Sequence, residues 1–197
     1  KEVLFITDPH FGKDATFRRA GIPIPIGGLT DDLARLSAAM DHSQARRLVI
    51  LGDFFHTNTS QSPQVLDGLR KWRTEYGDVP IMLIRGNHDR HAGAPPPDLR
   101  ITTVDEGEAL PPFLCHHEPV DDGKGDLAGY VLAGHLHPVV SLKERGGPGM
   151  RLPCFHFGDR QAILPAFAQF SGGYAITPKE NDSVFVVAED AVHKIVG

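Results

Sequence analysis

Cysteine, long apolar runs and excess positive charge are all scarce in this chain of 197 residues. Its two cysteines, Cys115 and Cys154, are too few for a disulfide framework. We expect reduced core thiols in a cytoplasmic protein, with a single disulfide as the alternative. No apolar run approaches the roughly 20 residues that span a bilayer, so the sequence predicts a soluble globular protein with no membrane partner. The net charge of −5 is also unlike that of a protein that holds nucleic acid by bulk electrostatics.

The first half of the chain alternates apolar strands with amphipathic helices. Short apolar runs predict buried strands at Val3–Thr7, Leu48–Leu51 and Ile81–Ile84. A helix capped by Thr30 and a helix that begins at Ser62–Pro63 are predicted between them. The resulting β-α-β-α-β order indicates a parallel sheet that is covered by helices.

The second half is richer in short strands. Six β-rich runs follow a loop at residues 93–98: Ile101–Val104, Phe113–Cys115, Tyr130–Ala133, Arg151–Phe157, Val184–Val187 and Val192–Val196. We expect these runs to form a second sheet rather than a second domain, so residues 1–197 are predicted to fold as a single domain. Residues 11–28, which contain Gly and Pro, are predicted to be irregular.

Four motifs combine histidine with a carboxylate, an amide or a second histidine, and each follows an apolar run. They are Asp8-Pro9-His10, Gly52-Asp53-Phe54-Phe55-His56, Gly86-Asn87-His88-Asp89 and Gly134-His135-Leu136-His137. Taken alone, the first, second and fourth motifs also fit turns or a surface pair, whereas Gly86-Asn87-His88-Asp89 has little structural use after a buried strand. Because the carboxyl ends of strands in an open α/β sheet gather around one crevice, we expect the four motifs to meet there.

The residue types in these motifs are typical of a metal site. Asp8 and His10 can reach one ion from a single turn, and Asp53 is a candidate for a carboxylate shared by two ions. Amide oxygens and imidazole nitrogens complete a mixed shell that suits Mn, Fe or Zn better than Ca. Two ions about 3.5–4 Å apart can clamp a phosphoryl group and activate water, so the sequence predicts hydrolysis of a phosphate ester.

The ordered set of motifs, with a histidine pair at His116 and His117, resembles the calcineurin-like metallophosphoesterase superfamily. The resemblance implies a four-layer α/β/β/α sandwich of two mixed sheets with a dimetal site at one edge. It implies that one ion is held by Asp8, His10, Asp53 and His137. It implies that the second ion is held by Asp53, Asn87, one histidine of the pair, and His135. In this mechanism a metal-bridging hydroxide attacks phosphorus directly, without a covalent enzyme intermediate.

Several roles around this ligand set follow from the same resemblance. His88 is implied to be the general acid or transition-state stabiliser, oriented by Asp89. The family pattern His-x-Pro favours His117 as the ligand, with His116 as the alternative. His56 stands where many relatives carry Asp, and we expect it to support a ligand rather than bind metal.

Three basic residues near the motifs are candidate substrate contacts. Lys13, Arg18 and Arg90 could bind substrate phosphates, since most phosphate contacts come from Arg or Lys. Solvated surface charge is the equally weighted alternative for all three.

Within the superfamily, the chain resembles the ligase-associated DNA-damage-response endonuclease family PdeM. The resemblance lies in residues 12–18 and 21–25, and in residues 152–155, Gly158 and residues 164–167. It implies a manganese-dependent phosphodiesterase with DNA endonuclease activity in DNA repair, associated with a DNA ligase, a helicase and an exonuclease. A small-molecule phosphodiesterase or phosphomonoesterase, acting on a cyclic nucleotide or nucleotide diester, is the alternative that the low positive charge favours. A non-catalytic scaffold ranks last because the whole ligand set is present.

Overall fold

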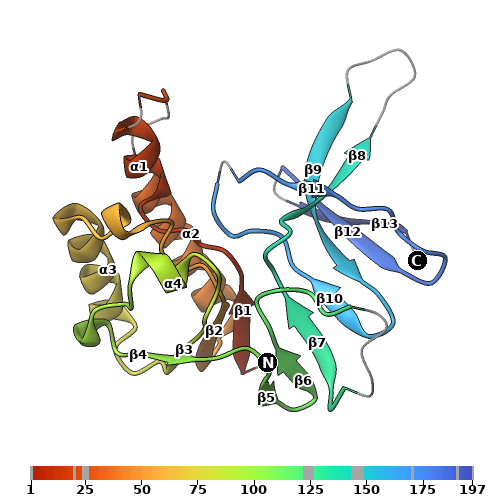
Figure 1. Ribbon diagram of the computed structural model, residues 1–197, viewed down its shortest axis with the longest axis horizontal. Helices are drawn as coiled ribbons and strands as arrows, with labels where there is room; N and C mark the ends of the chain where they lie inside the picture. The colour runs from red at the N-terminus through yellow and green to blue at the C-terminus, as the bar shows by residue number, and fades with distance from the viewer. Residues whose placement is uncertain are drawn as a thin grey trace.

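The computed structural model describes residues 2–19, 21–23, 27–121, 127–142, 149–169, 171–189 and 191–196. Two β-sheets lie face to face, and helices cover the outer face of the first sheet (Figure 1). The predicted class, a mixed α/β fold with two sheets and helices, is confirmed. Residues 24 and 25, which belong to one of the PdeM-like stretches, lie outside the described ranges.

The first sheet consists of four parallel strands in the order β1-β2-β3-β4. These strands are β1 (Val3–Ile6), β2 (Arg47–Leu51), β3 (Ile81–Ile84) and β4 (Ile101–Val104). The central strands β2 and β3 are almost entirely buried, as expected for a parallel sheet covered on both faces. All four strands run the same way, so the loops that follow them emerge at one edge.

All described helices precede β4. They are α1 (Lys13–Arg19), α2 (Gly28–Ser43), the 3₁₀ helix η1 (Asn58–Ser60), α3 (Pro63–Glu75), α4 (Asp89–Ala92) and the 3₁₀ helix η2 (Pro97–Leu99). Helix α3 begins as predicted, because Ser62 Oγ accepts a hydrogen bond from the Val65 amide and Pro63 occupies the first position. In the described ranges, no helix is long and apolar enough to cross a membrane.

Two predictions about the first helices are wrong. Residues 11–28 are not irregular throughout, because α1 occupies Lys13–Arg19. Helix α1 has no buried residue, so it lacks the apolar periodicity that would have revealed it. Helix α2 begins at Gly28 after a left-handed Gly27, not after Thr30, which falls in its first turn.

Within the described residues the second sheet contains nine strands, and it includes five of the six runs that were predicted to form it. The sixth, Ile101–Val104, is instead strand β4 of the first sheet, because it pairs in parallel with β3. The second sheet runs β11-β8-β9-β10-β7-β6-β5, with β12 added to β9 and β13 to β12. Its strands are β5 (Glu108–Leu110), β6 (Phe113–Cys115), β7 (Tyr130–Ala133), β8 (Pro138–Leu142), β9 (Met150–Phe157), β10 (Gln161–Ile163), β11 (Tyr174–Ala175), β12 (Ser183–Ala188) and β13 (Ala191–Val196). Four of these, β5, β8, β10 and β11, were not predicted.

Successive side chains along each strand of the first sheet point alternately toward the helices and toward the second sheet. Leu48, Ile50, Ile81 and Leu83 pack with the helices, whereas Val49, Leu51, Met82 and Ile84 pack against the second sheet. On the other side of this interface, Cys115, Leu132, Ala162 and Leu164 of the second sheet and its loops pack against them. Cys115 and Cys154 are both free and buried.

The outer face of the second sheet carries a small apolar cluster of its own. Phe155 faces the first sheet, so its neighbour Cys154 points outward, where it packs with Val184, Val186 and Ile176. In the described part of the chain, strand and loop residues form this outer cluster and helices do not contribute to it.

Candidate metal centre

The carboxyl ends of three parallel strands bring acid and amide side chains to one edge of the first sheet. Asp8 and His10 lie in the loop after β1, Asp53 in the loop after β2 and Asn87 in the loop after β3. The amides of Asp8 and His10 donate to the carbonyls of Gly52 (3.2 Å) and Asp53 (3.0 Å), which joins the first two loops. Side chains that are distant in sequence thus meet at the edge where ligands bind in open α/β sheets.

The second sheet contributes histidines to the same place. His117 follows β6, and His135 and His137 follow β7. The His135 amide donates to Asp8 Oδ2 at 2.9 Å, and the Gly134 amide donates to the His117 carbonyl at 2.9 Å. The centre is therefore built from both sheets and depends on their packing.

Five of the predicted ligands have a left-handed backbone. Their φ angles are 50° at Asp8, 43° at His10, 56° at Asp53, 64° at His135 and 49° at His137. This region is uncommon for residues other than glycine and costs free energy. The fold thus holds these loops in conformations that local preference disfavours, which is typical of functional sites.

One group of ligand atoms comes from Asp8, His10 and His137, and these atoms all lie within 4.8 Å of one another. Asp8 is 0% exposed and His10 is 3% exposed. His137 Nδ1 lies 3.1 Å from the Gly172 carbonyl oxygen. Because a carbonyl only accepts, Nδ1 carries the hydrogen and Nε2 presents its lone pair, 3.4 Å from Asp8 Oδ1.

A second group comes from Asp53, His117 and His135, with Asn87 beside it. Asn87 Oδ1 lies 2.8 Å from His117 Nε2 and 3.0 Å from His135 Nδ1, and these two nitrogens are 3.1 Å apart. His117 Nδ1 donates to the Leu51 carbonyl at 2.9 Å, so its Nε2 faces the group as an acceptor. The ligand atoms of these side chains thus lie close together, with the lone pair of His117 Nε2 facing the group.

Asp53 lies between the two groups. Its Oδ2 is 3.9 Å from His10 Nε2, and its Oδ1 is 3.5 Å from His117 Nε2. The backbone at Gly52 and Gly86 passes so close to these ligands that only glycine fits there. A Cβ at Gly86 would lie 2.2 Å from Asp53 Oδ1, and one at Gly52 would lie 2.1 Å from His117 Nδ1. One oxygen toward each group is the geometry that a shared carboxylate requires.

The charges of the centre are concentrated in two buried carboxylates. Burial opposes ionisation of Asp8, but the neighbouring imidazoles of His137 and His117 hold its pKa below the ordinary value. Burial raises the pKa of Asp53, and the like charge of Asp8 adds to the rise. Burial also lowers the pKa of His10 to about 2, so its imidazole is neutral and able to bind a cation.

These groups fit a pair of divalent ions. Asp8 Oδ1 and His10 Nδ1 are buried and have no hydrogen-bond partner within the described residues. Buried polar atoms without partners are costly, and bound cations would satisfy them. The mixed nitrogen and oxygen donors suit a first-row transition metal better than calcium.

Comparison with known proteins agrees with this geometry. The family model of the calcineurin-like phosphoesterases matches residues 1–159. The chain belongs to this family. The crystal structure of Pseudomonas putida nuclease MPE is similar to this phosphoesterase, with 38% identity and a TM-score of 0.79, over 93% of this chain and 84% of that chain. Yfce, a phosphoesterase from E. coli, has 17% identity and a TM-score of 0.49, over 100% of this chain and 93% of that chain. No curated protein matches the chain.

Asp89 does not orient His88 in this phosphoesterase, contrary to the role that the resemblance implied. Its Oδ2 accepts the amides of Asp53 (2.9 Å) and Gly86 (2.8 Å), and its Oδ1 accepts the amide of Phe54 (2.9 Å). His88 Nδ1 donates instead to the His56 carbonyl at 2.7 Å. Asp89 therefore fixes the two loops that carry Asp53 and Asn87, because its carboxylate is occupied by backbone amides.

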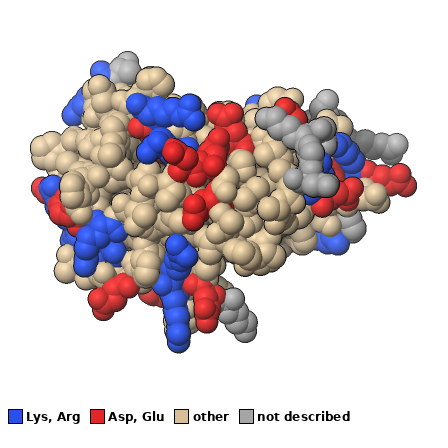
Figure 2. Space-filling model, turned by 60° about the horizontal axis from the view of Figure 1, so that its bottom comes forward, with Lys and Arg blue, Asp and Glu red and all other residues tan. Residues whose placement is uncertain are grey.

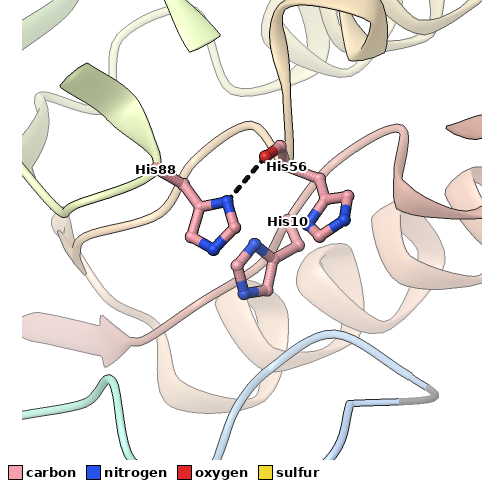
Figure 3. A group of neighbouring side chains, drawn as sticks. All are labelled: His10, His56 and His88. Atoms are coloured by element: carbon pink, nitrogen blue, oxygen red, sulfur yellow. Dashed lines mark hydrogen bonds between the residues drawn. The ribbon is translucent and has the colours of Figure 1, made fainter. Parts of the chain in front are cut away.

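His56 belongs to a cluster of three imidazoles with His10 and His88, as Figure 3 shows. Its ring stacks on His88 with centroids 5.1 Å apart and meets His10 edge-on at 5.2 Å. Burial, with the positive charges of Lys13 and His88, lowers the pKa of His56 to about 4. The ring thus packs against one predicted ligand and against the predicted general acid.

The two members of the histidine pair point to different places. The buried His117 lies among the ligand atoms, whereas His116 Nε2 would lie 3.9 Å from a Cβ built on Gly107, in the turn before β5. Adjacent residues of an extended chain point to opposite faces, which accounts for the separation.

The three predicted substrate contacts differ in burial and in partners. Lys13 is half-buried, and burial lowers its pKa against the opposing charges of Asp8, Asp32 and Asp53. Arg18 is exposed and pairs with Asp14 at 3.0 Å. Arg90 is exposed on the short helix α4. Lys13 interacts electrostatically with two carboxylates of the centre, Asp8 and Asp53.

The face of the molecule shown in Figure 2 has no continuous patch of basic side chains. On the face in Figure 2, Lys and Arg side chains are interspersed with Asp and Glu. This distribution agrees with the net charge of −5 and differs from a continuous basic track.

Sequence reasoning missed the backbone partners of the centre. The carbonyls of Leu51 and Gly172 orient His117 and His137, and the carbonyl of His56 orients His88. Any residue type supplies a carbonyl, so the sequence carries no signal for these contacts.

Proposed function

We propose that this chain is a dimetal-dependent phosphodiesterase that acts as a DNA endonuclease in DNA repair. The observation that carries the proposal is the pair of ligand groups that meet at Asp53, next to His88. One ion would be held by Asp8, His10, Asp53 and His137, and the other by Asp53, Asn87, His117 and His135. The similarity to Pseudomonas putida nuclease MPE supports a nucleic-acid substrate.

The ligand residues prepare the centre for an anionic phosphate. Bound divalent ions would polarise the phosphate and lower the pKa of a water molecule. The carbonyls of Leu51 and Gly172 keep His117 and His137 in the tautomers that present Nε2 to the centre. The strained loops at Asp8 and Asp53 keep the carboxylates in place before substrate arrives.

His88 is suited to give a proton to the leaving oxygen. Its Nε2 faces the centre, 4.0 Å from Asp53 Oδ2, and its Nδ1 is bound to the His56 carbonyl. Because that carbonyl retains the Nδ1 hydrogen, donation from Nε2 requires the imidazolium form of His88. The ring of His56 supports this orientation by stacking.

Lys13 would neutralise charge on the bound phosphate. It is half-buried beside the centre, and Arg or Lys contacts are common partners of phosphates. Arg18 and Arg90 would act farther out, on a substrate that extends beyond the centre. Manganese is the metal proposed, with iron or zinc compatible with the same ligands. Association with a DNA ligase, a helicase and an exonuclease is part of the proposal and rests on the PdeM resemblance.

Plasmid cleavage tests the proposal directly. Metal-stripped protein should nick supercoiled plasmid when Mn²⁺ is restored, and Asn87→Ala should not. Cleavage by the variant at the wild-type rate would refute the assignment of the site.

A small-molecule phosphodiesterase is the second candidate, because the net charge is −5 and charges on the face of Figure 2 are interspersed. Under matched Mn²⁺ concentrations, hydrolysis of cyclic nucleotides without cleavage of DNA would favour this candidate.

A further inference from the structure

A polar hollow of about 430 Å³ opens beside His88. Its walls are His56, Thr57, Asn58, Asn87, His88 and His91. A second cleft of about 670 Å³ begins at His137 and is lined mainly by apolar side chains such as Phe155 and Phe167. The two hollows thus meet different members of the ligand groups and differ in the types of residue that line them.

We propose that the polar hollow is the subsite for the leaving nucleoside, and that the substrate strand continues beyond it. This inference rests on the proposed function. The group that protonates the leaving oxygen must touch it, so the leaving group lies on the side of His88. The hollow begins at His88 and Asn87, on that side of the centre. His88 is fixed there by its bond to the His56 carbonyl and by stacking on His56 (Figure 3).

The size and walls of the hollow suit a nucleoside. Its volume falls within the roughly 300–1,000 Å³ of pockets that hold small organic ligands. The walls offer an amide, a hydroxyl and imidazoles, and they include neither a carboxylate nor a large aliphatic side chain. Asn58 is exposed, and its side chain makes no hydrogen bond to the described residues, so its amide is available to a ligand.

Cationic residues flank the hollow where a further phosphate would pass. Helices α1 and α4 both pack against η1, which carries Asn58. Arg19 of α1 donates to the Thr59 carbonyl at 3.2 Å, which places its guanidinium at η1. Arg90 is exposed on α4, next to the wall residue His91. A strand with a second phosphate would gain contacts here that a single diester would not.

Asn58→Asp tests the subsite, because a carboxylate there repels a neighbouring phosphate without altering the metal ligands. The matched control is Asn181→Asp, an exposed position in the loop before β12. The Mn²⁺-loaded proteins are assayed on bis-p-nitrophenyl phosphate and on a short oligothymidylate. We expect Asn58→Asp to lower kcat/KM on the oligonucleotide by about tenfold, or about 1.4 kcal/mol. It should change kcat/KM on the small diester by less than about twofold, and the control should change neither.

A second variant distinguishes the effect of added charge in the hollow from the effect of filling it. Asn58→Trp fills part of the hollow without adding charge and should weaken cleavage of the oligonucleotide, whose leaving nucleoside is larger than p-nitrophenolate, more than hydrolysis of the small diester. Equal losses on both substrates, or no loss on the oligonucleotide for either variant, would overturn the subsite while leaving the dimetal chemistry intact. Failure of the wild-type protein to hydrolyse bis-p-nitrophenyl phosphate would overturn the proposed function itself.

Discussion

The two sheets contribute to the metal centre in different ways. Asp8, His10 and Asp53, from the parallel sheet, are 0%, 3% and 2% exposed, whereas the side chain of His137, from the second sheet, is 18% exposed. The parallel sheet is covered by helices on one face and by the second sheet on the other, so packing fixes its loops from both sides. The parallel sheet thus supplies the buried carboxylates, whereas the second sheet supplies the buried imidazole of His117 and the more accessible imidazole of His137.

The same difference extends to the far end of the second sheet. Met150 in β9 and Tyr174 in β11 are 58% and 63% exposed, whereas Leu83 in β3 is fully buried. Exposure therefore rises in the second sheet away from the centre, and substitutions at its far end should affect the ligands less than substitutions in the parallel sheet.

The largest effect is expected at the shared carboxylate. Asp53→Asn removes one of the two buried charges, so we expect loss of bound Mn²⁺ and a loss of several kcal/mol of transition-state stabilisation, about 10³-fold in rate. His137→Ala, from the more exposed side, should lose less activity and retain one ion. Elemental analysis and hydrolysis of bis-p-nitrophenyl phosphate measure both quantities. Equal losses for the two variants would contradict the division between the sheets.

His88→Ala should lower turnover by about 10²-fold, within the range for general acid–base catalysis. Both ions should remain bound, because His88 lies outside the two ligand groups that Asp53 joins. The readout is kcat on oligonucleotide and on bis-p-nitrophenyl phosphate, with metal content measured on the same samples. The p-nitrophenolate leaving group needs less protonation, so its hydrolysis should fall less. Wild-type turnover in the variant would remove His88 from the mechanism.

Asp89→Asn should affect stability before it affects chemistry. The carboxylate accepts three buried backbone amides, and the amide of Asn would present hydrogens to at least one of them. We expect a loss of about 2–3 kcal/mol of unfolding free energy. The exposed Asp98, paired with Arg70 at 2.6 Å, is the control, and Asp98→Asn should cost less than about 1 kcal/mol. Urea denaturation compares the two variants, and similar midpoints would show that Asp89 is not an anchor.

The β-α-β-α-β order of the first half and the convergence of Asp8, Asp53 and Asn87 could be predicted because buried parallel strands leave continuous apolar runs and their ends meet at one edge. Helix α1 could not, since it buries no side chain and has no periodicity. The anchoring role of Asp89 was also hidden, because its partners are backbone amides that any residue type would provide.

The role of Asp89 shows where sequence reasoning stops. An Asp that follows His invites a side-chain pair, and nothing in the residue types reveals that the loop turns the carboxylate toward Gly86 and away from the imidazole. Tertiary placement of the loop decided between two chemically reasonable partners.

The smallest expected effect compares two buried aspartates, one from each half. Burial raises the pKa of Asp32 in α2 to about 6, and the partial compensation by Arg35, 3.8 Å away, is insufficient. Burial also opposes ionisation of Asp182, but hydrogen bonds from the Lys179 amide (2.7 Å) and His156 (2.7 Å) hold its pKa below the ordinary value. The two groups should therefore give stability opposite dependences on pH.

The stabilising contribution of Asp32 is present in full below its unfolded pKa of about 3.9 and is lost as pH rises through about 6. Asp32→Asn should thus gain stability relative to wild type between pH 4 and pH 7, on the order of 1 kcal/mol after solvent screening. For Asp182 the sign reverses, because its contribution is present above the unfolded pKa and is lost as pH falls. Asp182→Asn should therefore be most destabilising near neutral pH. Urea denaturation of both variants at the two pH values measures the slopes, and slopes of the same sign would show that the two carboxylates are not held differently.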